Sequence, residues 1–287
     1  MPKPRTNTAI GLNRAPGYYS AVVLKRDQIS QQEFRSYPFN VPAIAHLDTL
    51  ELDPKITIIV GENGTGKSTL IEAIAIAAGM NAEGGSKNFS FSTRKSHSVL
   101  HDRIELRRGA RRERDGFFLR AESMYNFATV LDQLDSYDAP GPKLIKSYGD
   151  VSLHEQSHGE SFFAVLANRF GEDSFLVMDE PESALSPARQ LYLLGQMQRL
   201  IVQSQCQFVL STHSPILMSY PGATLYRLDT SGIARTRLED TEHFQITRNF
   251  LTNYHDALAQ LFADPDLKAG KAERSQRRTS RAHDVAQ

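Results

Sequence analysis

The chain has 287 residues, 40% hydrophobic and 23% charged, which is typical of a globular protein and excludes a fibrous or disordered one. Lys plus Arg and Asp plus Glu number 33 each, so no overall charge favours nucleic acid or an anionic membrane. The single cysteine, Cys206, excludes an internal disulfide and predicts a reducing, cytoplasmic location. The chain begins without the apolar segment of a signal peptide, and its longest apolar run, Ala73–Ala78, is too short to span a membrane. No direct membrane insertion is therefore expected.

The first quarter of the chain predicts a strand–loop–helix unit. Residues 1–16 show no periodicity and are expected to form a flexible arm. Strands are expected at Tyr18–Leu24 and around Ile56–Val60, and the second is β-branched and apolar, as a strand covered on both faces should be. From Ser68 to Gly79 the apolar residues follow a helical period.

The middle of the chain is more polar. Residues 81–100 are serine-rich and predict a surface segment. The stretches Arg103–Arg108 and Phe117–Arg120 are expected to pair as a hairpin with a charged turn, and Met124–Leu134 is expected to be helical. Seven arginines cluster on the expected hairpin: Arg103, Arg107, Arg108, Arg111, Arg112, Arg114 and Arg120. Because acidic residues partly offset them, a solvated hairpin is favoured, and a nucleic-acid contact is the alternative.

The second half alternates strands with helices. Ser186 and Pro187 are suited to the N-cap and first position of a helix whose buried stripe includes Leu193 and Met197. The last 24 residues, 264–287, have no apolar periodicity and are expected to form a disordered basic tail. Other elements are expected as helix Ser161–Phe170, strands Phe175–Met178, Phe208–Leu210, Leu225–Leu228 and Ile233–Arg237, the last two at a sheet edge, and a closing helix Phe244–Phe262.

This alternation predicts an α/β fold with a largely parallel sheet flanked by helices. We expect one P-loop domain over residues 17–263, with a small inserted lobe at about 86–170.

The strongest motif lies between the strand ending at Val60 and the helix that follows. Gly61 and Gly66, with four residues between them, precede Lys67 and Ser68, which is the phosphate-loop pattern. Such glycines let backbone N–H groups point at phosphate oxygens, Lys67 reaches the β- and γ-phosphates, and Ser68 offers a hydroxyl to Mg²⁺. The sequence therefore predicts an ATP site formed by Gly61, Glu62, Asn63, Gly64, Thr65, Gly66, Lys67, Ser68 and Thr69.

A second motif is the apolar strand Phe175–Met178, which ends in Asp179 and Glu180. A carboxylate at the end of a buried strand can face the phosphate loop across the sheet, so Asp179 is expected to hold Mg²⁺ with Ser68. Glu180 is placed to polarise a water in line with the γ-phosphate, and we expect it to be the general base.

These motifs resemble those of ABC-class ATPases. The segment Val177–Ser186 looks like the Walker B strand and D-loop of that class, Ser157–Ser161 like its signature loop, and His213 stands where the class keeps a γ-phosphate-sensing switch histidine. The resemblance covers about residues 20–230. It implies that the signature residues contact the ATP of an opposite subunit. The residues so implied are Ser157, Gly159 and Glu160 in the signature loop and Ser183, Ala184, Leu185 and Ser186 in the D-loop.

The sequence also departs from the class pattern. His158 replaces a signature glycine, and Ser186 stands where the D-loop usually has Asp. No glutamine occupies the Q-loop position, for which Glu122 is the candidate by position, and the aromatic that stacks on adenine is left open between Tyr37 and Phe39. The motifs around Gly61 and His213 resemble the soluble RecF/SMC-like and OLD-like branch more than transporter subunits.

The resemblance implies ATP- and Mg²⁺-dependent homodimerisation with hydrolysis, as a soluble switch in DNA repair or phage defence. Two alternatives stay open: the ATP-binding subunit of a membrane transporter, and a non-hydrolysing regulatory module in which ATP clamps a protein partner.

Overall fold

The computed structural model describes residues 17–86, 98–120, 124–136, 143–149 and 151–263. Its main element is a seven-stranded sheet of order β10-β9-β3-β8-β7-β6-β4. The strands from β9 to β6 pair in parallel, and the edge strands β10 and β4 are antiparallel. The expectation of a largely parallel α/β sheet is therefore confirmed. The strands of this sheet are β3 (Ile56–Val60), β4 (Gly85–Ser86), β6 (Asp115–Arg120), β7 (Ser174–Asp179), β8 (Gln207–Ser211), β9 (Thr224–Asp229) and β10 (Gly232–Thr236).

Each central strand contributes to two separate hydrophobic cores. In β7, Leu176 and Met178 join one core, whereas Phe175 and Val177 join the other. Successive side chains of a strand point to opposite faces of the sheet, so a fully apolar strand can supply both cores. All six residues of β7 and all five of β3 and of β8 are buried, which explains why their sequences are almost continuously apolar.

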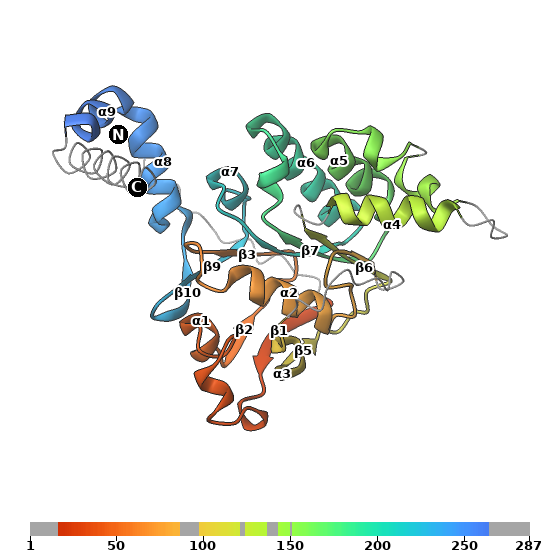
Figure 1. Cartoon of the computed structure of the whole chain (residues 1–287), viewed down its shortest axis with the longest axis horizontal. Helices are drawn as coiled ribbons and strands as arrows, with labels where there is room; N and C mark the ends of the chain where they lie inside the picture. The colour runs from red at the N-terminus through yellow and green to blue at the C-terminus, as the bar shows by residue number, and fades with distance from the viewer. Residues whose placement is uncertain (1–16, 87–97, 121–123, 137–142, 150, 264–287) are drawn as a thin grey trace, which may run out of the picture. The chain divides into compact units, whose positions relative to one another are not determined.

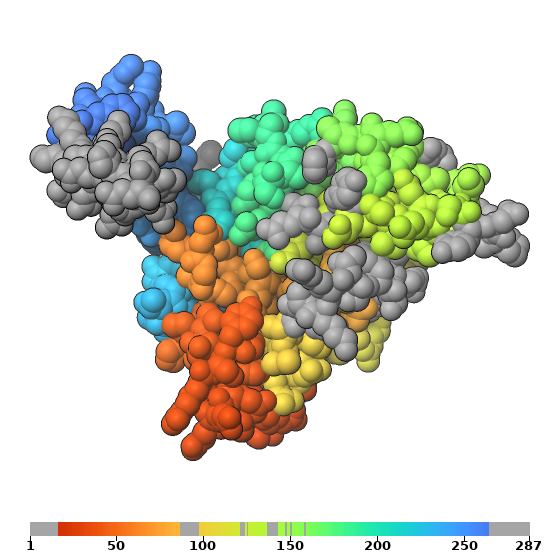
Figure 2. Space-filling model, viewed as in Figure 1, coloured from red at the N-terminus to blue at the C-terminus, as the bar shows by residue number. Residues whose placement is uncertain are grey.

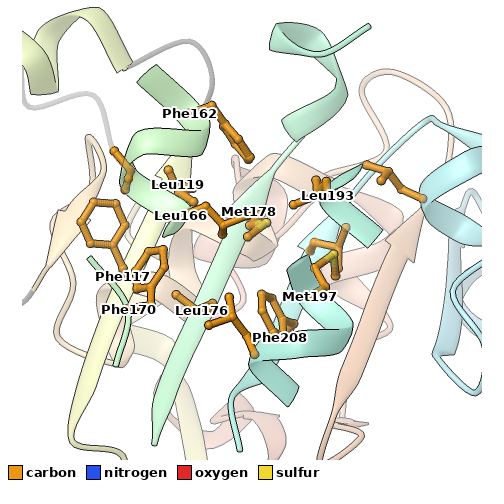
Figure 3. Close-up of a cluster of buried hydrophobic side chains, with 14 of the residues drawn as sticks. Phe117, Leu119, Phe162, Leu166, Phe170, Leu176, Met178, Leu193, Met197 and Phe208 are labelled. Atoms are coloured by element: carbon orange, nitrogen blue, oxygen red, sulfur yellow. The ribbon is translucent and has the colours of Figure 1, made fainter. Parts of the chain in front are cut away.

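The first core lies between the sheet and a layer of helices. This layer contains α4 (Met124–Ser136), α5 (His158–Asn168), α6 (Pro187–Gln203) and α7 (Pro215–Met218) (Figure 1). Figure 3 shows Phe162 and Leu166 of α5 and Leu193 and Met197 of α6 packed toward Met178 of β7. The Ser186 hydroxyl accepts the backbone N–H of Arg189 and so caps α6 as expected.

The second core lies on the opposite face of the sheet, beneath α2 (Lys67–Ala77) and a three-stranded antiparallel sheet of order β2-β1-β5. In Figure 2 this N-terminal part runs from red-orange to yellow and lies mostly below the green residues of α4 to α6. The elements are β1 (Tyr19–Leu24), β2 (Thr49–Glu51), β5 (Ile104–Arg108), α1 (Pro42–Ala45) and α3 (Leu100–Arg103).

The expected hairpin is wrong. The strand β5 pairs with β1 in the small sheet, whereas β6 runs parallel to β7 in the large one. The two strands therefore diverge after the charged turn and enter different sheets. The reason is burial: four residues of β6 are buried as an interior strand requires, whereas only Ile104 is buried in β5. Of the expected lobe at 86–170, then, β5 and β6 belong to the sheets.

The chain separates into two compact units, one ending at Leu238 and the other beginning at Glu239. Within its described residues, up to 263, the second unit has the helices α8 (Glu242–Thr252) and α9 (Tyr254–Ala263) in place of the single closing helix that the sequence predicted. At Asn253 the backbone leaves the helical conformation, with φ −133° and ψ +37°. The expected arm and tail lie outside the described residues, and the expected limits at 17 and 263 stay predictions.

Candidate functional site

The phosphate-loop pattern lies between the carboxyl end of β3 and the first turn of α2. Gly61, Gly64 and Gly66 have φ values of +152°, +81° and +95°, a region that favours glycine. A Cβ on Gly61 would lie 2.4 Å from the carbonyl oxygen of Leu228 on β9, so the loop also needs glycine there for space. Gly66 is the N-cap of α2, which directs the free N–H groups of that helix toward the loop. Glu62, Asn63 and Gly64 are exposed, so the loop is accessible to a ligand.

Lys67 carries the ammonium of this loop. Its side chain is only 4% exposed, and Nζ donates a hydrogen bond to the carbonyl oxygen of Glu62 at 3.1 Å. The Glu180 carboxylate lies 4.0 Å away. Burial lowers the pKa of Lys67, and the nearby carboxylates of Glu180 and Asp179 oppose that shift. The chain therefore holds a desolvated cation at the end of the sheet, with carboxylates as its neighbours.

Asp179, at the carboxyl end of β7, is buried beside hydroxyl groups. The Ser211 hydroxyl donates to its Oδ1 at 2.6 Å, and the Ser68 hydroxyl also forms a hydrogen bond with this carboxylate. Arg120 Nε lies 3.6 Å from Oδ2. Burial raises the pKa of Asp179, and the bonds from Ser211 and the charge of Arg120 act in the opposite direction.

The predicted metal ligands, Ser68 and Asp179, are thus brought together. A hydroxyl and a carboxylate are the hard oxygen donors that Mg²⁺ prefers, and Mg²⁺ usually takes only one or two carboxylates and completes its shell with phosphate and water. Among the described residues no group of three or more His, Cys, Asp or Glu side chains could hold a metal ion. The donor set fits Mg²⁺ bound together with a nucleotide.

Glu180 and His213 lie close to each other in the loops that follow β7 and β8. Glu180 is in the left-handed region, with φ +46° and ψ +55°, immediately after the strand. Its backbone N–H is held by the carbonyl and hydroxyl oxygens of Ser211 at 3.2 Å each. His213 Nε2 lies 3.2 Å from Glu180 Oε1. Because β7 and β8 are adjacent and parallel, the residues after both strands share one edge of the sheet.

The signature residues form the start of α5. The helix begins at His158, three residues before the expected Ser161, because Ser157 and Glu160 make a capping box. Glu160 Oε2 accepts the backbone N–H of Ser157 at 2.9 Å, and the Ser157 hydroxyl also donates to it. Gly159 is buried under Arg189, whose Nη1 would lie 2.3 Å from a Cβ at that position. The contacts described for these residues are with α5 and α6, so their predicted contact with ATP stays a prediction.

The D-loop candidates lie in η6 (Pro181–Ala184) and the residues that follow. The Ser183 hydroxyl donates to the carbonyl oxygen of Glu180 at 2.8 Å, so the start of the loop is tied to the end of β7. Ser183 is exposed and Ala184 partly so, whereas Leu185 is buried in the first core. The role of these residues in a subunit contact stays a prediction.

Of the remaining candidates, Glu122 lies outside the described residues. Phe39 is 1% exposed and belongs to the second core, so it cannot stack on a nucleotide. Tyr37 is 61% exposed, and its hydroxyl lies 2.8 Å from that of Thr69 beside the phosphate loop. Of the two aromatics, only Tyr37 is placed to meet a base.

Sequence reasoning missed two residues of this site. Arg120, at the end of β6, forms ion pairs with Glu72 of α2 at 2.8 Å and with Asp179. Its position beside the carboxyl end of β7 results from the pairing of β6 with β7, which no local sequence pattern indicates. Glu182 is a partly buried carboxylate that accepts the backbone N–H of His213 at 2.5 Å. No local pattern indicated Glu182, because its partners lie in a loop that follows a different strand.

The arginine-rich segment is largely neutralised. Five of its seven arginines pair with a carboxylate, which favours a solvated segment over the alternative of a nucleic-acid contact. These pairs are Arg103–Glu33, Arg108–Glu113, Arg111–Asp173, Arg114–Asp173 and Arg120–Glu72.

Two family models match the chain. One described as "AAA domain" matches residues 28–125, and one described as "AAA domain, putative AbiEii toxin, Type IV TA system" matches residues 105–219. Together they run from before the phosphate loop to beyond His213. A curated relative, the lipoprotein-releasing system ATP-binding protein LolD of Chromohalobacter salexigens, is 24% identical over 243 residues, which cover 76% of this chain and 95% of that protein.

Two solved structures are also similar. The SMC head domain from Thermotoga maritima has a TM-score of 0.41 at 14% identity and covers 77% of this chain and 98% of that one. "An inward-facing conformation of a putative metal-chelate type ABC transporter" has a TM-score of 0.43 at 16% identity, covering 79% and 85%. Within the described residues, none of the helices combines the length and the apolar character needed to cross a membrane.

Proposed function

We propose that this ABC-class P-loop ATPase hydrolyses ATP at a site shared between two copies of the chain. Membership of that class, and with it ATP binding, follows from the motifs, the parallel sheet and the two AAA-domain matches. Hydrolysis, the dimer and the residue roles below are the proposal.

The observation that carries the proposal is the gathering of five side chains at the carboxyl ends of β3, β7 and β8. Lys67 is the cation for the β- and γ-phosphates, and Ser68 with Asp179 would hold Mg²⁺, which screens the charge of the phosphates when bound. Glu180 accepts the proton of the attacking water, and His213, 3.2 Å from it, contacts the γ-phosphate.

The dimer is supported by the start of α5. Ser157 is its N-cap and Gly159 lies in its first turn, and the N–H groups that the capping box leaves free can bind an anion, as helix N-termini do. The phosphate loop, Asp179 and His213 surround a triphosphate from one side. A two-fold pairing would place α5 of each copy over the ATP of the other and would complete two sites at once.

The test mixes two inactive variants, Lys67→Ala and Ser157→Arg. In a heterodimer one composite site carries both substitutions, and the other carries neither. ATPase activity restored on mixing supports the shared site. Activity that stays at the level of each parent, in a mixture where labelled chains are shown to exchange, refutes it.

The cellular role stays part of the proposal. DNA repair or phage defence, and a cytoplasmic location, rest on the resemblance to the RecF/SMC-like and OLD-like branch. ATPase rates measured with and without duplex DNA test the first, since a DNA-activated enzyme would turn over faster with duplex. A copurifying membrane protein would favour the transporter alternative, and ATP binding without turnover would favour the regulatory clamp with a protein partner.

A further inference from the structure

The proposed mechanism gives no role to Glu182, a partly buried acid of the site. Glu182 is the second residue of η6, and its Oε1 accepts the backbone N–H of His213 at 2.5 Å. The Thr212 hydroxyl also forms a hydrogen bond with this carboxylate. Burial raises the pKa of Glu182, so a carboxylate at this position is held at a cost in free energy.

These bonds join two loops that follow neighbouring strands. Glu182 belongs to the loop after β7, whereas Thr212 and His213 belong to the loop after β8. The same loop after β7 carries Glu180, whose Oε1 lies 3.2 Å from His213 Nε2. His213 therefore meets one short segment at two points: its backbone N–H is bonded to Glu182, and its ring nitrogen Nε2 lies beside the Glu180 carboxylate.

The segment continues directly into the D-loop candidates. The Ser183 hydroxyl is bonded to the carbonyl oxygen of Glu180 at 2.8 Å, and the Leu185 N–H is bonded to the carbonyl oxygen of Glu182 at 3.0 Å. A shift of the exposed Ser183 would therefore displace the carboxylate that holds the backbone of His213.

We propose that Glu182 is a positioning residue that sets the place of the His213 ring through the backbone of the loop after β8, and so links the D-loop to the γ-phosphate contact. This inference rests on the proposed function for the role of His213, but the contact itself does not. Glu182 acts through His213, because the described hydrogen bonds that its carboxylate makes beyond its own residue go to Thr212 and His213 of that loop. It does not accept the proton of the attacking water.

The experiment uses a double-mutant cycle on the full chain with Glu182→Ala, His213→Ala and both together. We expect each single change to lower kcat by roughly 10²-fold, in the range of a lost transition-state contact, with the Kd for ATP changed less than about threefold. In the double variant the two losses should not multiply, because each removes the same contact. Glu182→Gln keeps an acceptor oxygen for the His213 N–H, so it should recover most of the rate and also shows whether the alanine variant fails only by misfolding.

A second readout does not depend on hydrolysis. In nuclear magnetic resonance spectra of chains with labelled histidine, Glu182→Ala should move the ring signals of His213 and leave most of the other eight histidines in place. If the wild type proves unable to hydrolyse ATP, this shift still stands and only the proposed function fails. Unmoved His213 signals, or rate losses that multiply in the double variant, overturn the inference. A Glu182→Gln variant as slow as Glu180→Gln would instead give Glu182 a direct chemical role and overturns it as well.

Discussion

Replacing Glu180 with glutamine should tighten ATP binding as well as slow turnover. Glu180 Oε1 lies 4.0 Å from Lys67 Nζ and 3.2 Å from His213 Nε2, the two groups that we assign to the γ-phosphate. Without nucleotide, the carboxylate therefore occupies the neighbourhood that a phosphate of like charge must enter. Glutamine keeps the size of the side chain and removes the charge, so both the competition for Lys67 and the repulsion of the γ-phosphate fall.

The distance sets the size of the effect. Two unit charges 4 Å apart interact by about 1 kcal/mol in water and by about 4 kcal/mol at an effective dielectric constant of 20. Glu180 is 36% exposed, so solvent screening keeps the gain near the lower value. We expect a gain of about 1 to 2 kcal/mol, which is a Kd for ATP about five- to thirtyfold lower. Turnover should fall by ~10²-fold or more, because the amide cannot accept the proton of the water.

Calorimetric titration with ATP and with ADP, each with Mg²⁺, measures the effect. ADP has no γ-phosphate, so its affinity should rise less than that of ATP. Glu172→Gln is the matched control, because Glu172 is 72% exposed, lies before the other end of β7 and makes the same change in charge. An unchanged Kd for ATP, or equal gains for ATP and ADP, would refute the placement of Glu180 beside the γ-phosphate.

Three further outcomes are expected. Lys67→Ala should abolish nucleotide binding in the same titration, because the phosphate loop loses its ammonium. In steady-state assays, Arg120→Ala should raise the Mg²⁺ concentration needed for half-maximal turnover, because Asp179 loses the guanidinium that opposes its protonation. The pKa of Glu182 is raised above its ordinary 4.5, so the folded chain binds that proton more tightly than the unfolded chain does, and stability falls as pH rises from about 4.5 to the raised value. Glu182→Gln should therefore melt no lower than the wild type at neutral pH, and a Tm several degrees lower would contradict this sign.

The phosphate loop and the buried strands could be predicted from sequence because their signals are local. Gly61 to Ser68 is a contiguous pattern, and the continuous apolar run of β3 is enough to predict that this strand is buried. The start of α5 could also have been predicted, since Ser157 and Glu160 have the spacing of a capping box, although the helix was expected to start at Ser161.

The wrong hairpin and the missed site residues both depend on pairing between segments that are distant in the sequence. Arg103–Arg108 and Phe117–Arg120 are separated by a turn-like sequence, yet β5 pairs with a strand some 80 residues earlier and β6 with one about 60 residues later. Arg120 reaches Asp179 only through that second pairing, so no local pattern could have placed it in the site. The same holds for Glu182, whose partner loop follows a different strand.

Because the central strands supply side chains to both hydrophobic cores, the chain can tolerate changes of length only at certain places. Because Leu176 and Val177 supply opposite cores, inserting or deleting one residue inside β7 would exchange the two sets of side chains between faces. It would also move Asp179 and Glu180 by about 3.3 Å along the strand, away from Ser68 and His213. Insertions and deletions that spare activity should therefore fall in the connections between strands, and natural versions of this chain should differ in length there rather than within β3, β7 or β8.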